Sequence, residues 1–153
     1  KTARLFEAGA QIAAIVAKAP APVEAALTRY GKHLGIAFQL IDDALDYEGD
    51  PGELGKNIGD DLAEGKPTLP LIHALANSDA ASAAMIREAI EQGGTEQQAP
   101  ILEMVERSGG LDYTARLAEG EANKAEEALA AIPASPYRDA LAGLARFAVS
   151  RRS

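Results

Sequence analysis

The sequence predicts an all-α protein, and three observations support this fold class. Of the 153 residues, 47% are apolar but only 5% are aromatic, and most of the apolar residues are Ala and Leu, which have the best helix propensities. Aromatic and β-branched residues, which favour strands, are comparatively scarce. Apolar residues recur at helical spacing, and no stretch of useful length alternates between apolar and polar residues as a half-buried strand would.

The first two predicted helices lie on either side of a proline pair. Residues 2–18 form the first helix, which ends before Pro20 because the residue preceding a proline disfavours helical geometry. The second helix begins near Pro22, a residue tolerated in a first turn, and runs to Tyr47. Within it, apolar residues three or four positions apart form a stripe that we expect to face the core. They are Leu34, Ala37, Phe38, Ile41 and Leu45.

A segment rich in glycine and proline follows, from Glu48 to Pro67. This composition marks a loop, and loops held by a rigid scaffold often carry binding residues. Five more helices complete the chain, separated by Gly93-Gly94, Gly109-Gly110 and Pro133 among other breaks. They are predicted at residues 68–77, 79–92, 96–108, 111–132 and 135–151. The length fits one domain over residues 1–153, with a binding helix and loop at 35–68.

The net charge of −8 and the absence of cysteine narrow the function. An acidic chain without a basic stripe is poorly suited to nucleic acid, and divalent cations, or anions bridged by them, are more natural partners. Without cysteine no disulfide or thiolate metal site can form, and a reducing cytoplasm is the expected location. No apolar run approaches the about 20 residues of a membrane span. His33 and His73 lack partners at metal-ligand spacing and are expected to be surface or satisfied core residues.

Four polar residues near the end of the second predicted helix share one face. Gln39 lies three and four positions before Asp42 and Asp43, and these two lie four and three positions before Asp46. Like charges at this spacing destabilise a helix by about 0.2–0.5 kcal/mol per pair, so a bound cation is the simplest reason for three of them. Magnesium prefers one or two carboxylates together with waters and phosphate oxygens. The pattern therefore favours a Mg²⁺ ion shared with a diphosphate.

The alternative is a solvated acidic face that only aids solubility, and the neighbouring residues argue against it. Lys56 and Lys66 follow in the glycine-rich loop. Lysine is a compact point charge suited to phosphate oxygens, although either lysine alone would fit an ordinary solvated loop. Two lysines beside three aspartates can hold a Mg²⁺–diphosphate assembly from both sides.

The run GIAFQLIDDALDYEGDPGELGKNIGDDLAEGKPTLPLIHAL, at 35–75, resembles the second aspartate-rich region of the trans-isoprenyl diphosphate synthases. The opening KTARLF resembles the Lys-Thr motif of that family. The later runs MIREAIEQGG and YRDALAGLARFAVSRR resemble the C-terminal helices of its bacterial octaprenyl-forming members. The similarity covers essentially the whole chain. It implies a helical bundle of the isoprenoid synthase type, of which this chain holds only the C-terminal part.

The resemblance also implies a reaction. The family condenses an allylic diphosphate with isopentenyl diphosphate, and the allylic diphosphate ionises to an allylic cation. Mg²⁺ and basic residues stabilise the departing diphosphate. For this chain the resemblance implies a transferase with a long-chain all-trans polyprenyl product, of the octaprenyl type used in the side chain of quinones such as ubiquinone. It further implies a homodimer in the full-length protein and a cytoplasmic location, with peripheral attachment to the membrane that receives the product left open.

The roles that the resemblance implies fall into three sets. Asp42, Asp43 and Asp46 would bind Mg²⁺ on the allylic diphosphate. Lys1, Lys56 and Lys66 would contact that diphosphate, and Thr2 and Gln39 would lie close to the reacting carbon, with Gln39 also near the diphosphate. Arg151 and Arg152 would lie near the isopentenyl diphosphate, with ordinary solvated arginines as the alternative. The catalytic set is thus Lys1, Thr2, Gln39 and Lys66.

The family uses two aspartate-rich motifs on facing helices, and this chain holds only the second. The first motif lies upstream in the family, as do the basic residues that hold isopentenyl diphosphate. Together with a start at Lys1 instead of Met, this leads us to expect the C-terminal half of a protein roughly twice as long, inactive by itself. We also expect a contiguous exposed apolar patch of more than about 400 Å² around residues 2–18 and 34–45.

Two other functions remain open. One is a non-catalytic helical subunit that partners an intact prenyl synthase, although such a subunit would be expected to lose members of the aspartate–lysine set that are all present here. The other is a structural helical bundle whose acidic face is incidental. Magnesium-dependent binding of pyrophosphate separates this last hypothesis from the first two.

Overall fold

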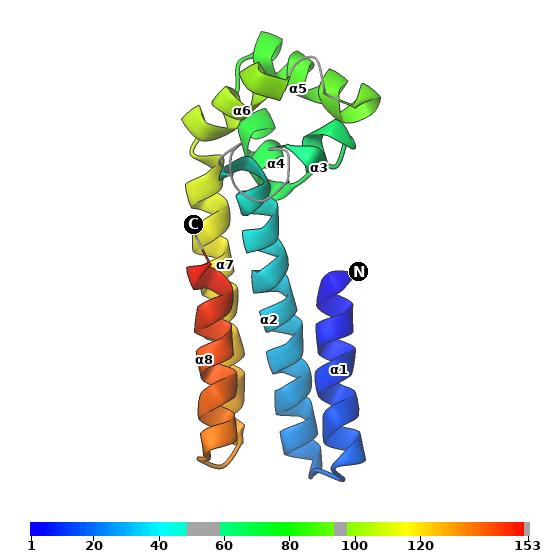
Figure 1. Ribbon diagram of the computed structural model, residues 1–153, viewed down its shortest axis with the longest axis vertical. Helices are drawn as coiled ribbons and strands as arrows, with labels where there is room; N and C mark the ends of the chain where they lie inside the picture. Colours follow the sequence, from blue (N-terminus) through cyan, green and yellow to red (C-terminus); the bar gives the residue numbers. More distant parts are fainter. Residues whose placement is uncertain (49–58, 94–97, 152–153) are drawn as a thin grey trace. The chain divides into compact units, whose positions relative to one another are not determined.

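The computed structural model describes residues 1–48, 59–93 and 98–151, and every regular element within these ranges is helical (Figure 1). The predicted all-α class is confirmed. The elements are α1 (Thr2–Val16), α2 (Ala21–Glu48), α3 (Asp60–Ala63), α4 (Leu69–Ala76), α5 (Ala80–Gln92), α6 (Gln98–Arg107), α7 (Gly110–Ala128), the 3₁₀-helix η1 (Leu129–Ala131) and α8 (Pro136–Ser150). No helix in these ranges is long and apolar enough to cross a membrane.

The structure differs from the predicted elements mainly at two places. The predicted loop from Glu48 to Pro67 contains the short helix α3, which Gly59 and Gly65 flank in left-handed conformations, with φ of 79° and 69°. The helix predicted at 111–132 tightens into η1 for its last turn, as helix ends often do. The remaining boundaries agree within about two residues, the usual uncertainty of helix ends.

The chain divides into two compact units, and the first comprises Lys1–Ile41 and Arg116–Arg152. In it α1, α8 and the larger parts of α2 and α7 run side by side (Figure 1). Its core joins α2 to α7 and α8 through Tyr30, Leu34, Ala125, Ala128, Leu129, Ala145 and Ala148. The Tyr30 hydroxyl donates a hydrogen bond of 2.8 Å to the carbonyl of Leu141, which ties α2 to α8.

Helices α1 and α2 approach each other closely at two glycines. A Cβ atom built on Gly31 would lie 2.5 Å from the Phe6 carbonyl oxygen, and one built on Gly35 would lie 2.7 Å from the Cα atom of Ala3. Both neighbours are backbone atoms, which cannot yield as a flexible side chain can. The rings of Phe6 and Phe38 pack beside this crossing with centroids 5.4 Å apart. The absence of side chains at Gly31 and Gly35 therefore sets the distance between the two helices.

The structure shows exposed large apolar side chains on one of the two segments where we expected a patch. On α1 the exposed large side chains are those of Leu5 (73%), Ile12 (58%), Ile15 (55%) and Val16 (76%). The expectation for residues 34–45 is wrong for Leu34 and Ile41, which are only 4% and 1% exposed. Leu34 is covered because it packs in the core with residues of α7 and α8.

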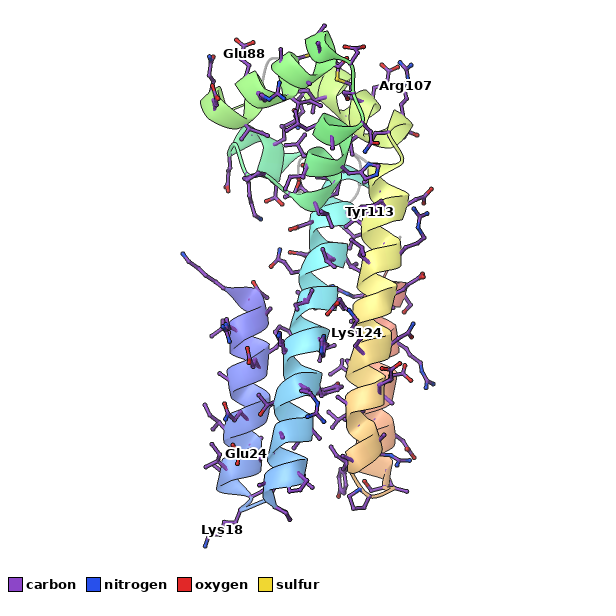
Figure 2. The ribbon with its side chains drawn as sticks, turned by 180° about the vertical axis from the view of Figure 1, so that it is seen from behind. Lys18, Glu24, Glu88, Arg107, Tyr113 and Lys124 are labelled. Atoms are coloured by element: carbon purple, nitrogen blue, oxygen red, sulfur yellow. The ribbon has the colours of Figure 1, made fainter. Side chains whose placement is uncertain are left out.

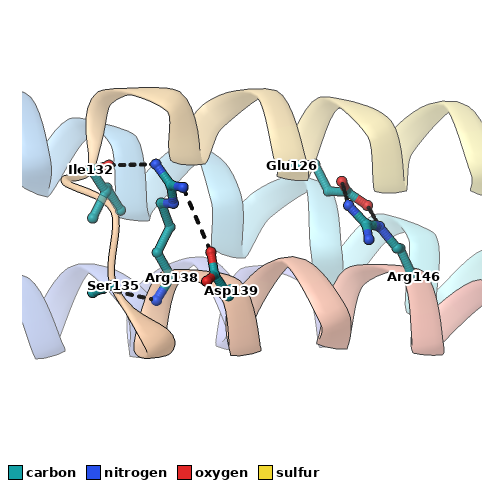
Figure 3. Close-up of polar contacts among 6 residues, drawn as sticks. All are labelled: Glu126, Ile132, Ser135, Arg138, Asp139 and Arg146. Atoms are coloured by element: carbon teal, nitrogen blue, oxygen red, sulfur yellow. Dashed lines mark hydrogen bonds and ion pairs between the residues drawn. The ribbon is translucent and has the colours of Figure 1, made fainter.

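The start of α8 is capped by Ser135 (Figure 3). The Ser135 hydroxyl accepts a hydrogen bond of 3.2 Å from the backbone N–H of Arg138, and the Arg138 guanidinium donates to the carbonyl of Ile132 at 3.3 Å. Further along, Arg146 of α8 and Glu126 of α7 form a two-point ion pair with both distances at 2.6 Å. The cap and the ion pair join α8 to the preceding segment, on either side of a proline in the first turn.

Replacing Ser135 with alanine is expected to lower the free energy of unfolding by about 1 kcal/mol, because an N-cap hydroxyl satisfies an otherwise unpaired backbone N–H. Urea unfolding measures the change. Ser135→Asp, which keeps an oxygen acceptor at the cap, serves as the control and should retain most of the stability. Equal losses in both variants would show that the cap hydrogen bond does not stabilise α8.

The second unit covers Asp42–Ala115 and has its own core. Its buried residues come from the end of α2 and from α3 to α6: Tyr47, Leu62, Leu71, Ala74, Ile86, Ala89, Ile101 and Val105. Charged residues such as Glu88 on α5 and Arg107 on α6 lie on its outside (Figure 2). This core fixes the end of α2 against α3 and α4, where several of the predicted site residues gather.

Candidate functional site

The last two turns of α2 carry a concentration of negative charge. Asp42 is exposed, and Asp43 and Asp46 are half-buried. No basic residue lies in the last turn of this helix. The C-terminal end of a helix bears a partial negative charge, so carboxylates are unfavourable there and cations are favoured. The position of these aspartates therefore adds to their mutual repulsion and leaves the helix end in need of positive charge.

Asp46 is held at the start of α3. Its carboxylate Oδ2 accepts a hydrogen bond of 3.1 Å from the backbone N–H of Asp61, and its main-chain carbonyl accepts one of 2.8 Å from Gly59. Burial, together with the charges of Asp61 and Asp60, raises the pKa of the Asp46 carboxyl to about 6, although the Asp61 N–H and Lys66 act to lower it. The raised pKa shows that the ionised form of this carboxyl is disfavoured, mainly because the side chain is partly buried.

Lys66 reaches the same place through Asp61. Its ammonium Nζ donates to the Asp61 carboxylate at 2.8 Å, and its backbone N–H donates to the Asp61 carbonyl at 2.8 Å. The pair with Asp61 raises the pKa of Lys66, and the charges of Asp43 and Asp46 act in the same direction. The structure thus brings two predicted site residues, Asp46 and Lys66, to a shared partner.

That partner, Asp61, is the residue that sequence reasoning missed. It was one of several charged residues in a predicted loop, and no helical spacing relates it to Lys66 five positions later. The contact forms because α3 ends at Glu64 and Gly65 turns the chain back with a positive φ of 69°. The signal in the sequence was the pair of glycines at 59 and 65, which permit a short helix with turns at both ends.

A second link joins α2 to the segment of Lys66. The hydroxyls of Tyr47 and Thr68 share a hydrogen bond of 2.6 Å. Both residues are buried, Tyr47 being 8% and Thr68 3% exposed. Burial raises the pKa of the Tyr47 phenol to about 12. Tyr47 is the residue directly after Asp46, so this bond and the one from Asp61 hold the same turn of α2.

Lys1, Thr2 and Gln39 lie in the first unit. Lys1 is exposed at the start of α1 without a side-chain capping bond, and Thr2 is half-buried in the first turn. Gln39 is half-buried on α2, three positions before Asp42. Lys56 and Arg152 lie outside the described residues, so their predicted roles stay predictions.

Arg151, at the end of α8, lies over the ring of Phe38, with its guanidinium carbon 4.2 Å from the ring centroid. Its Nε donates to the carbonyl of Ala148 at 3.3 Å. Its Nη2 atom is buried and has no hydrogen-bond partner among the residues described. A guanidinium that stacks on an aromatic ring is still positively charged and can bind an anion through its N–H groups. Arg151 is thus held beside the residue that directly precedes Gln39.

The donor set suits a hydrated magnesium ion better than an all-protein cage. Within residues 1–48, 59–93 and 98–151, no three His, Cys, Asp or Glu side chains converge as a ready-made metal site. Magnesium keeps several waters and binds through one or two carboxylates and phosphate oxygens, so such convergence is not required. The position of the Asp46 carboxylate beside Asp61 and the exposed position of Asp42 fit an ion bound in this way.

The two histidines have structural contacts. The Nδ1 atom of His33 lies 2.7 Å from a carboxylate oxygen of Glu121 on α7. The ring of His73 packs on that of Tyr113, with centroids 4.6 Å apart. Neither belongs to a group of metal ligands in the part of the chain that the structure describes.

Comparisons with known proteins show to which family the chain is similar. The chain is 54% identical to octaprenyl diphosphate synthase of Escherichia coli over 152 residues, which is 99% of this chain and 47% of that protein. It is 49% identical to an all-trans-nonaprenyl-diphosphate synthase of Rhodobacter capsulatus, with 99% of this chain and 46% of that protein covered. The chain therefore spans about half the length of the curated relatives it matches.

A solved structure shares the fold closely. The polyprenyl synthase of Caulobacter crescentus CB15, crystallised with calcium and isoprenyl diphosphate, superposes with a TM-score of 0.90 at 46% identity, over 100% of this chain and 47% of that one. The family described as polyprenyl synthetase matches residues 1–107, which include α1, α2 and the aspartate–lysine cluster. On this match and these likenesses, the chain belongs to the polyprenyl synthetase family.

Proposed function

We propose that this chain provides the second aspartate-rich, Mg²⁺-dependent diphosphate site of a trans-polyprenyl diphosphate synthase. The reaction would join an allylic diphosphate to isopentenyl diphosphate and yield a long-chain, all-trans product of the octaprenyl type. The observation that carries the proposal is the cluster of Asp46, Asp61 and Lys66 at the acidic end of α2, where two carboxylates lie beside a lysine. The names of the long-chain synthases among the relatives support the product class.

The chemistry follows from where charge develops. When the C–O bond of the allylic diphosphate breaks, both electrons leave with the diphosphate, and the carbon becomes an allylic cation. A magnesium ion, when bound, neutralises part of the diphosphate charge and acts as a Lewis acid. The exposed Asp42 and the half-buried Asp43 would hold that ion, and Asp46 would do so from a fixed position against α3.

The basic residues bind the departing diphosphate directly. Lys66 keeps its ammonium at the site because Asp61 holds it, and a compact ammonium suits a phosphate oxygen. Lys1 and Lys56 would add charge to the same diphosphate. The Thr2 hydroxyl and the Gln39 amide would lie close to the allylic carbon. Arg151, stacked on Phe38, would hold the diphosphate of isopentenyl diphosphate. Fixed charges of this kind act where the transition state gains charge.

Calorimetry of pyrophosphate binding tests the site. We expect the chain to bind pyrophosphate in excess MgCl₂ and to lose this binding in EDTA. Binding that is equally strong in EDTA would point to a simple basic patch. No binding in either buffer would contradict the proposed function.

The isolated chain is proposed not to condense prenyl units, because it holds only one of the two aspartate-rich motifs that the family uses. Incubation with farnesyl and isopentenyl diphosphates tests this claim separately from binding. Release of pyrophosphate together with a longer prenyl product, from the 153-residue chain alone, would overturn it.

A further inference from the structure

We propose that Tyr47 and Thr68 are positioning residues for the diphosphate site, because the hydrogen bond between their hydroxyls fixes the segment of Lys66 against the end of α2. This inference rests on the proposed function and deepens it. Neither residue is placed to touch the diphosphate, since both are buried. Their effect would pass through Lys66 and Asp46, their neighbours in the chain.

Thr68 lies at the start of α4, where a threonine hydroxyl ordinarily caps the helix. It is the N-cap residue of α4, and a threonine there usually accepts a hydrogen bond from a backbone N–H of the first turn. No such bond forms in this case. The hydroxyl instead lies 2.6 Å from that of Tyr47, 21 residues earlier in the chain. The structure therefore uses the hydroxyl for a long-range contact in place of local capping.

The contact closes a small ring of interactions around the site. On one side, the Asp46 carboxylate accepts from the Asp61 N–H, and the Asp61 carboxylate accepts from Lys66. On the other side, Tyr47 bonds to Thr68, whose backbone N–H donates to the Lys66 carbonyl at 2.9 Å. Lys66 is thus fixed from both ends, through its side chain and through its main chain.

The buried Tyr47–Thr68 hydrogen bond holds the main chain near Lys66 more firmly than the Lys66–Asp61 pair holds its side chain. The Lys66 side chain is 47% exposed, so its pair with Asp61 is open to water and salt, which weaken such pairs. The buried Tyr47–Thr68 bond is shielded from both. Loss of one hydroxyl would leave the other buried without a partner and free the segment between α3 and α4 to shift.

The first unit contains a matched control. Tyr30 is also buried on α2, at 3% exposed, and its hydroxyl donates a hydrogen bond of 2.8 Å across to Leu141. Burial raises its pKa to about 12, as for Tyr47. Tyr30→Phe and Tyr47→Phe therefore remove similar hydroxyls from the same helix. Only Tyr47 lies next to the proposed metal ligands in the chain.

The test compares Mg²⁺-dependent pyrophosphate affinity, urea unfolding and hydrogen exchange in wild type and variants. We expect Tyr47→Phe and Thr68→Val each to weaken affinity about three- to tenfold, as the loss of one buried hydrogen bond implies. The double variant should be little worse than either single one, because both remove the same bond. Thr68→Ser, which keeps the hydroxyl, should stay within about twofold of wild type. Amide exchange over residues 60–68 should accelerate in Tyr47→Phe even without ligand.

The possible outcomes distinguish failure of the positioning role from failure of the proposed function. If the wild type binds pyrophosphate and both Tyr47→Phe and Tyr30→Phe bind it with the same affinity, the positioning role is overturned and the proposed function stays intact. Equal loss of affinity in both tyrosine variants would overturn it too, because a general loss of stability would then explain the result. Absence of Mg²⁺-dependent binding in wild type would overturn the function and this inference together.

Discussion

Asp46→Asn is expected to weaken Mg²⁺-dependent pyrophosphate binding by about tenfold or more while leaving the fold at least as stable as wild type. Loss of groups that merely support metal ligands commonly lowers affinity by about 10–100-fold, and a direct ligand should matter at least as much, so a loss of about tenfold or more is expected. Asparagine can still accept the hydrogen bond from the Asp61 N–H through its side-chain oxygen. The local structure is therefore retained.

The expected gain in stability follows from the direction of the pKa shift. The Asp46 carboxyl has a raised pKa of about 6 in the folded protein, against 3.8 as its ordinary value. The folded state therefore takes up a proton before the unfolded state does as the pH falls from about 6 towards 4. In metal-free buffer this carboxyl makes the protein more stable at pH 4 than at neutral pH, and Asp46→Asn removes that contribution to the pH dependence.

Calorimetry and thermal unfolding across this pH range, both in the presence and in the absence of Mg²⁺, measure the two effects. Asp112→Asn is the matched control, since it removes one exposed carboxylate from the first turn of α7 and changes the net charge equally. A similar fall in affinity for both variants would attribute the effect to overall charge. A large fall in melting temperature for Asp46→Asn would show that the carboxylate is a structural group.

Gly35→Ala is expected to lower the free energy of unfolding by about 1–3 kcal/mol, the usual range for an inserted group that forces backbone to move. The new Cβ would meet the Cα atom of Ala3 at 2.7 Å and the Cβ atom of Phe6 at 2.9 Å. Either α1 must move away or α2 must bend. Because α1 begins with Thr2, such a movement would also displace a predicted site residue.

At a second glycine, Gly143, replacement by alanine is expected to raise the free energy of unfolding. Gly143 lies within α8, and no neighbouring atom lies within 4 Å of the place that a Cβ atom would occupy there. Gly143→Ala should therefore stabilise the protein by about 0.5–1 kcal/mol, because alanine loses less backbone freedom in a helix than glycine does. Urea unfolding of both variants gives the comparison. A gain in stability for Gly35→Ala, similar to that of Gly143→Ala, would contradict the close contact between α1 and α2.

Sequence patterns sufficed for the long helices but not for the way the site is assembled. Pro20 and Pro22 bound α1 and α2, and the spacing of Leu34, Ala37 and Ile41 identified a buried face, because such signals act over a few residues. The spacing of Asp42, Asp43 and Asp46 likewise placed three carboxylates on one face of a real helix.

The contacts that organise the site depend on residues distant in the chain. Asp46 meets the Asp61 N–H across 15 positions, and Tyr47 meets Thr68 across 21. Helix α3 has only four residues, too few for a periodic pattern, and it is anchored by the buried Leu62. Tertiary packing creates these contacts, so local sequence patterns had no means to predict them.

The crowding of carboxylates at the end of α2 also determines how a bound cation would respond to ionic strength. Part of its affinity would come from relief of repulsion between side chains that are exposed or half-buried. Dissolved ions screen such repulsion over a Debye length of about 10 Å at 0.1 M salt. Salt would therefore weaken the repulsion between the carboxylates in the metal-free protein, and the affinity for the cation would fall. We therefore expect such a chain to bind its metal ion most tightly at low ionic strength.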